Sequence, residues 1–171
     1  MKTSSVLRVS LLAAALGAAL SANAVSILLA SSGSGVNVGN DFNQTETVFT
    51  QVGGYGPLGS LTLSTDTNTL TGTGTYTGTG GTLSFTYTFT GATANGSGQS
   101  VSGDWTATGG TGTYAGSTGI GTLALTVLAT GPQPLATGTV FAGDVQAVPE
   151  PASMAALGVG AIGLLKRRKR A

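Results

Sequence analysis

Apolar and polar residues alternate along much of the middle of this chain. In residues 82–90, Leu, Phe and Tyr occupy every second position, and Thr or Ser fills the positions between them. Residues 101–108, which include Trp105 on the apolar side, and residues 123–127 repeat the pattern. Side chains of an extended strand point to opposite faces in turn, so this alternation predicts strands with one buried face. Three further strands are predicted at residues 25–29, 45–52 and 139–145.

Threonine forms a second regular pattern, because it occupies every second position from Thr65 to Thr79. A period of two predicts all eight side chains on one face of an extended chain. Gly72 and Gly74 predict a bend that divides the run into two strands. Residues 31–35, Ser-Ser-Gly-Ser-Gly, predict a turn or loop after the first strand.

Two glycine-rich segments, residues 72–83 and 110–123, resemble each other. Each reads as a turn, a Tyr-bearing strand, a second turn and an apolar strand, which predicts a repeated hairpin. Two copies are too few to close a propeller, and the length favours a single antiparallel unit. We therefore predict an all-β domain over residues 25–147, folded as one antiparallel β-barrel or sandwich of short Thr/Gly-rich strands.

The composition excludes several classes of chemistry. The chain of 171 residues has 29 glycines and no cysteine or histidine. It therefore lacks disulfides, thiol nucleophiles, the commonest general base and the commonest zinc ligand. Positive charge is confined to the two ends, and no Lys or Arg lies between Val25 and Val148. The body cannot neutralise phosphates, so we expect no nucleic-acid binding.

The acidic residues of the body form no catalytic or metal-binding pattern. Asp66-Thr67-Asn68 is the nearest approach to a calcium loop, and it lacks the distal glutamate. A Ser or Thr nucleophile has no His or Lys partner in the body. We therefore expect no enzyme activity, metal or cofactor, and interpret the acids as solvated charges that keep the protein soluble. These acids are Asp41, Glu46, Asp66, Asp104 and Asp144.

Residues 1–24 have the three regions of a secretory signal peptide. Lys2 and Arg8 give a basic start, Val9–Leu20 is apolar, and Ala22-Asn23-Ala24 is a small-residue cleavage site. The segment predicts a signal helix, cleavage after Ala24 and export of the body.

Residues 148–171 combine three elements in sequence. The first is the acidic motif Val148, Pro149, Glu150 and Pro151, and the second is the uncharged segment 152–165. The third is a basic end made of Lys166, Arg167, Arg168, Lys169 and Arg170. As a helix, segment 152–165 would be roughly 21 Å long, which is short against a hydrocarbon core of about 30 Å. Long basic side chains reach the headgroups and act as a stop-transfer signal, so we expect this helix to anchor the chain in the inner membrane.

This arrangement resembles the PEP-CTERM sorting signal of exported proteins in Gram-negative bacteria. The resemblance implies handling by exosortase, a membrane protease-transpeptidase. It also implies export through the inner membrane as an anchored precursor, then delivery to the cell surface or an exopolysaccharide matrix. The same tail is found on some ice-binding proteins.

Residues 109–116, with Gly119 and Gly121, resemble a motif of the dirigent and allene-oxide-cyclase-like barrels. In those eight-stranded barrels, a Gly-Gly-Thr-Gly-x-aromatic segment makes a tight corner before a strand. This resemblance implies a barrel and carries no activity to this chain. Three roles for the body stay open. The first is a non-catalytic structural or adhesive surface protein, and the second is a barrel that binds ice or polysaccharide. The third is a degenerate dirigent-like enzyme, which a lumen lined by polar groups would favour.

Overall fold

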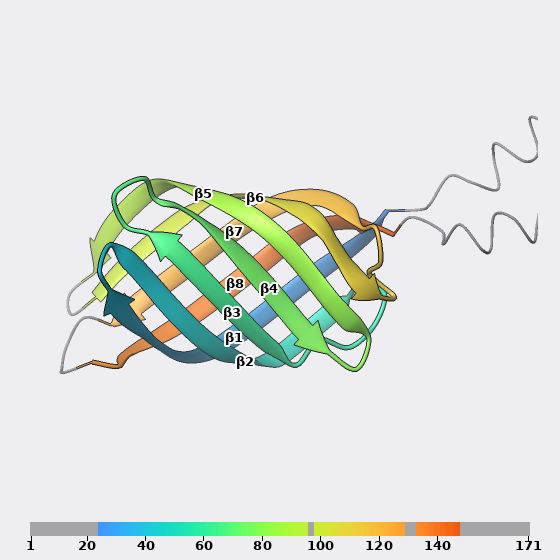
Figure 1. Cartoon of the computed structure of the whole chain (residues 1–171), viewed down its shortest axis with the longest axis horizontal. Coiled ribbons are helices and arrows are strands. Elements are labelled where there is room, and N and C mark those ends of the chain that lie inside the picture. The colour runs from blue at the N-terminus through green and yellow to red at the C-terminus, as the bar shows by residue number, and fades with distance from the viewer. Residues whose placement is uncertain (1–23, 96–97, 129–132, 148–171) are drawn as a thin grey trace, which may run out of the picture. The chain divides into compact units, whose positions relative to one another are not determined.

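A computed structural model describes residues 24–95, 98–128 and 133–147, which form a closed barrel of eight antiparallel strands (Figure 1). Each strand pairs with its neighbours in sequence, and the last returns to pair with the first. The predicted antiparallel barrel is confirmed and the sandwich alternative is wrong. The strands are β1 (Val25–Val38), β2 (Asp41–Gly53), β3 (Ser60–Asp66), β4 (Thr71–Gly78), β5 (Gly81–Asn95), β6 (Gly98–Gly112), β7 (Thr118–Leu128) and β8 (Leu135–Gln146).

The predicted membrane helix at 152–165 lies outside the described residues, as does the predicted signal helix apart from Ala24. The described ranges include no helix that is long and apolar enough to cross a membrane.

The apolar phase of the alternating segments faces the barrel interior, as predicted. Trp105 of β6 is 1% exposed, and its ring stacks on Phe141 of β8 with 4.2 Å between ring centroids. Phe85 of β5 packs against the same Phe141 ring at 4.9 Å. The apolar residues at alternate positions of β5, from Leu83 to Phe89, are all buried. The core is therefore an aromatic cluster centred on β5, β6 and β8.

Glycines on neighbouring strands make room for these rings. A Cβ atom on Gly74 of β4 would lie 2.3 Å from the Phe85 ring, and one on Gly72 would lie 2.5 Å from the Tyr87 hydroxyl. Gly121 of β7, the register partner of Trp105, gives space to the indole ring, because a Cβ atom there would lie 2.7 Å from Trp105 Nε1. These glycines lie inside strands because the side chain across from them fills their volume.

The strands are longer than the sequence predicted, and six of the eight have at least 11 residues. Residues 31–35 continue β1 instead of forming a turn. Their polar and glycine residues include two buried positions, Ser31 and Gly35, which face inwards. The loop prediction was wrong because this part of the barrel interior is itself polar.

The threonine run divides at residues 67–70 and not at Gly72 and Gly74, which lie within β4. The Asp66 carboxylate ends β3 by accepting hydrogen bonds from the backbone N–H groups of Asn68 and Thr69. Two strands are confirmed, but the eight threonines do not share one face. Thr65 is buried inside the barrel, whereas Thr73 and its neighbours on β4 point outwards.

The two similar glycine-rich segments are not equivalent in the fold. Tyr76 lies within β4, whereas Tyr114 lies in the turn between β6 and β7. The repeated-hairpin prediction is therefore wrong. The second segment does form a tight corner before a strand, with Gly112 and Gly116 at φ values of 61° and 63°, a region that glycine adopts without strain.

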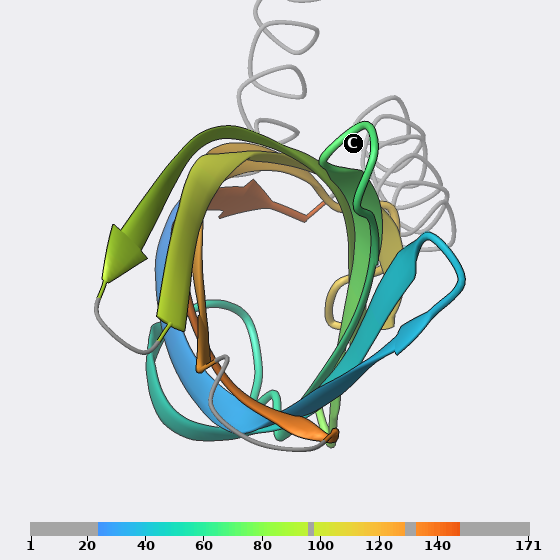
Figure 2. The ribbon, with the colours of Figure 1, turned by 90° about the vertical axis from the view of Figure 1, so that its left-hand side faces the viewer.

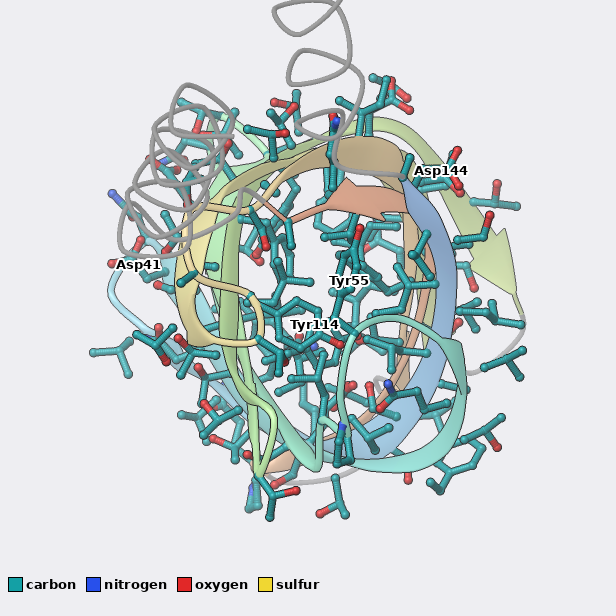
Figure 3. All side chains as sticks on the ribbon, turned by 90° about the vertical axis from the view of Figure 1, so that its right-hand side faces the viewer. Asp41, Tyr55, Tyr114 and Asp144 are labelled. Atoms are coloured by element: carbon teal, nitrogen blue, oxygen red, sulfur yellow. The ribbon has the colours of Figure 1, made fainter. Side chains whose placement is uncertain are left out.

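The two ends of the barrel differ. At the closed end, where Val25 pairs with Val145, the loop between β2 and β3 covers the interior. The Tyr114 hydroxyl donates to the Gly56 carbonyl at 2.7 Å and accepts from the N–H groups of Tyr55 and Gly56 at 3.2 Å. Figure 3 shows Tyr55 and Tyr114 towards the middle of the ring of strands. The opposite, open end carries the β1–β2 and β3–β4 turns (Figure 2).

Candidate functional site

The interior of the barrel has a polar wall on β1, β2 and β8. It consists of the buried residues Ser31, Gln44, Glu46, Thr137 and Thr139. The Ser31 hydroxyl donates to Glu46 Oε2 at 2.6 Å. Gln44 Nε2 donates to Glu46 Oε1 at 3.1 Å and to Thr139 Oγ1 at 3.2 Å. The wall therefore ties three strands together by side-chain hydrogen bonds.

Glu46 contradicts the prediction that the acids of the body are solvated, because it is only 2% exposed. It lies on the same face of β2 as Phe42 and Gln44, so the period of the strand turns it inwards. The other four acids agree with the prediction better. Asp41, Asp104 and Asp144 are exposed and Asp66 is half-buried; Figure 3 shows Asp41 and Asp144 at the outside of the ring.

Tyr76 of β4 is fully buried beside this wall. Burial raises the pKa of its hydroxyl far above the ordinary value, the Ser31 hydroxyl lowers it in part, and the Glu46 carboxylate raises it further. Within the described residues, the Tyr76 hydroxyl has no partner in good hydrogen-bond geometry. The same holds for Gln44 Oε1 and Thr137 Oγ1. The lumen is therefore polar on one side. A polar lumen is the feature that would favour the third predicted role, a degenerate dirigent-like enzyme.

An outer groove crosses β1 to β4 on the surface of the barrel. It has a volume of about 460 Å³ and is lined by three residues from each strand, namely 34–36, 43–45, 62–64 and 73–75. The central residues of the four triplets, Gly35, Gln44, Leu63 and Gly74, are register partners across the sheet. The tip of the β1–β2 hairpin lies away from the ring of strands (Figure 2), and the groove lies between this hairpin and β4.

The flanking side chains of the groove are hydroxyls and amides, apart from Val36, and none of them is charged. Thr45, Ser64 and Thr73 make no side-chain hydrogen bond to another described residue, whereas Thr62 donates weakly to the Thr75 carbonyl at 3.4 Å. These hydroxyls can therefore donate to, and accept from, a molecule in the groove.

A second cavity, the end pocket, lies at the open end of the barrel. Its volume is about 220 Å³, and seven of its eleven lining residues are apolar. Phe42 and Phe89 are among the apolar residues, and Thr65 is the buried polar one. Thr65 Oγ1 lies 2.6 Å from the Tyr87 hydroxyl. Glu46 lines neither the groove nor the end pocket.

Metal binding finds no support in the described ranges, which contain no group of three or more His, Cys, Asp and Glu residues able to hold an ion. The predicted sorting residues Val148–Pro151 and the basic end 166–170 lie outside those ranges, and so does Ala22. Ala24 is exposed and directly precedes β1. The proposed cleavage site stays a prediction.

Comparison with known families matches residues 147–170 to the PEP-CTERM protein-sorting motif. The match covers the acidic motif, the uncharged segment and the whole basic end, so the first resemblance is confirmed. Comparisons with curated proteins and with solved structures found no match. The likeness to dirigent barrels therefore rests on the barrel and on the tight corner at Gly112 and Gly116, and no comparison supports it.

Proposed function

We propose that this chain, which carries a PEP-CTERM protein-sorting motif and is thus an exported target of exosortase, serves as a non-catalytic adhesive module. Its destination is the cell surface or an exopolysaccharide matrix, and it holds neutral polysaccharide in the outer groove. The membrane-anchored precursor is processed at its C-terminal end, and the barrel is the part that works outside the cell.

The observation that carries the adhesive role is the uncharged, hydroxyl-lined groove across four strands. Strands are spaced by about 4.8 Å, so the groove presents hydroxyls at regular intervals across β1 to β4. A neutral polysaccharide offers hydroxyls of the same kind and needs no ion pair. Since residues 25–148 contain no Lys or Arg, the barrel has nothing to attract an anionic polymer.

The non-catalytic role rests on the chemistry of the side chains. The chain has no His or Cys, and its cations lie outside the barrel. Glu46 and Tyr76 would be the strongest acid–base pair, but both are enclosed by the core and Glu46 is out of reach of both cavities. Ice binding is less well supported than polysaccharide binding, because a flat threonine array is needed and these threonines lie on a curved barrel.

The groove is tested with the exported, processed protein in native gels that contain neutral polysaccharides, dextran among them. We expect retardation of the wild type. The double variant Thr45→Val, Thr73→Val keeps the shape of the side chains and removes two free hydroxyls, so it should bind about five- to tenfold more weakly. The matched control Thr86→Val, Thr88→Val changes the same outer face on β5, outside the groove, and should bind like the wild type. Equal retardation of the two double variants would refute the binding of polysaccharide in the outer groove.

Sorting is tested separately, by mass spectrometry of the mature C-terminus in cells that contain exosortase. Processing removes the basic end, so the mature mass should stop short of Lys166. A mature protein that still ends at Ala171 in such cells would contradict the processing step.

A further inference from the structure

We infer that the end pocket binds a neutral small molecule that is largely apolar and carries one oxygen acceptor. The inference does not depend on the adhesive role, because the pocket and the outer groove have no lining residue in common.

The walls of the pocket define the apolar part of the ligand. Phe42, Phe89 and Leu125 form buried walls, and Val101 and Val127 are partly buried. A volume of about 220 Å³ is below the range of drug-sized sites, so the pocket fits a single ring or a short chain. None of the lining residues is charged. An ionised ligand would lose its hydration there without gaining a partner.

A pair of buried hydroxyls defines the polar part of the ligand. Thr65 and Tyr87 are 5% and 3% exposed, and their oxygens are 2.6 Å apart. Two hydroxyls carry two protons, and one contact between them uses only one. Neither hydroxyl makes another hydrogen bond to a described residue. When Tyr87 donates to Thr65, the Thr65 hydroxyl is free to donate to an acceptor in the pocket that Thr65 lines.

The rim of the pocket carries a strained apolar residue. Leu70, in the β3–β4 turn, has a φ of 56° and is 39% exposed. Its backbone is held by hydrogen bonds, from its own N–H to the Asp66 carbonyl and from the Phe89 N–H to its carbonyl, both 2.8 Å. Glycine or asparagine adopts this conformation more readily than leucine. A leucine there holds a large apolar side chain over the pocket, which a turn alone does not require.

Three probes of similar shape test the ligand class by isothermal titration calorimetry, with the exported, processed protein in the absence of detergent. Acetophenone is neutral and has one carbonyl acceptor, and it should bind at a single site. Ethylbenzene lacks the acceptor and should bind about five- to tenfold more weakly. Benzoate is charged and should show no saturable binding. Absence of saturable acetophenone binding, or equal binding of all three probes, would overturn the inference.

Variants locate the binding in the pocket. Thr65→Val should abolish the preference for acetophenone over ethylbenzene, whereas Val127→Phe should fill the pocket and abolish the binding of both. Val52→Phe is the matched control, because Val52 is 60% exposed and does not line the pocket. It should leave both affinities unchanged. Wild-type affinity in Val127→Phe would place the binding elsewhere and overturn the inference.

Leu70→Asn keeps the test decisive if Val127→Phe does not fold. It should weaken acetophenone binding while leaving the denaturant midpoint equal to or above that of the wild type, because asparagine suits the left-handed turn. Unchanged acetophenone affinity in folded Leu70→Asn would contradict the binding of the ligand beneath Leu70 in the end pocket. The groove variant Thr45→Val, Thr73→Val should bind acetophenone normally, so failure of the adhesive role can be told apart from failure of the pocket.

Discussion

A carboxyl group buried in a protein normally has a cation beside it, but the described part of the chain offers none to Glu46, because residues 25–148 contain no Lys or Arg. Its two oxygens accept hydrogen bonds from Ser31 and Gln44 instead. Removing a donor from this network leaves a buried polar atom without a partner, which lowers the stability of the fold. The polar wall therefore favours one arrangement of β1, β2 and β8 over shifted pairings of the same strands.

Ser31→Ala should lower the free energy of unfolding by about 1–3 kcal/mol, because it leaves Glu46 Oε2 buried without a donor. The adjacent Ser32→Ala is the control, since Ser32 is exposed and its removal should change stability by less than about 0.5 kcal/mol. Urea unfolding of both variants measures the difference. Equal stability of the two would mean that the wall contributes nothing.

A second prediction at this scale concerns alkaline pH. Burial raises the pKa of Tyr87 from 10.0 to about 12, and the hydrogen bond between Tyr87 and Thr65 opposes this shift. The folded state thus favours the protonated hydroxyl. This contribution should be fully present below about pH 10 and should be lost as the pH rises from there through about 12. In unfolding experiments across this range, Tyr87→Phe should lose stability less steeply than the wild type. Identical slopes would show that Tyr87 does not titrate as described.

The sequence pattern predicted that Tyr87 is buried, but it did not predict that Glu46 is buried. Both outcomes depend on whether the inward face of the strand is apolar. In β5, large apolar residues occupy every second position, and this alone identifies the face that points into the barrel. In β2 the inward residues Gln44 and Glu46 are polar, and the outward Phe49 is 67% exposed. Alternation shows that a strand has two faces, but here the polarity of the residues points to the wrong one.

At the scale of the strands, glycine and aromatic residues are complementary. Gly74 is the register partner of Phe85 on one side and of Leu63 on the other, and both side chains occupy the space above it. The Phe42 ring of β2 likewise occupies the space above Gly35 of β1, although the register partner of Gly35 is Gln44. The glycine content that suggested bends and short strands is used for packing within long strands. Composition alone could not show this, because the partner of each glycine lies on another strand.

Gly74→Val should lower the free energy of unfolding by about 1–3 kcal/mol or more, because its side chain would collide with Phe85 and Leu63. Thr73→Val alters the next residue, which points outwards, and should be nearly neutral. Thermal unfolding followed by circular dichroism compares the two variants. A stable Gly74→Val protein would mean that the barrel expands locally at little cost.

For the molecule as a whole, closure through β1 and β8 is the defining feature. Eleven register pairs join these strands, from Val25 with Val145 to Gly35 with Leu135. The sequence predicted the all-β class and the sorting signal from local patterns. It left barrel and sandwich open, because closure depends on contacts between residues at least one hundred positions apart.

Closure predicts that a circular permutant folds. Joining Gln146 to Val25 by a short linker, and opening the chain between Asn68 and Thr69 in the exposed β3–β4 turn, keeps every strand pair. Its far-ultraviolet circular dichroism spectrum and cooperative unfolding should match those of the parent barrel. A chain that lacks residues 135–146 is the control, and it should not unfold cooperatively because β1 and β7 lose their partner. A permutant that aggregates like this control would argue against the closed seam.

The β1–β8 seam also sets an order of events on the far side of the membrane. In a chain that emerges from its N-terminal side, β1 arrives first and its partner arrives last. Until then the growing sheet exposes two free edges, which are templates for pairing with other chains. Once β8 has emerged, a tail that stays in the membrane keeps each chain apart from its neighbours while β8 pairs with β1. The tail would then act as a folding aid as well as an address.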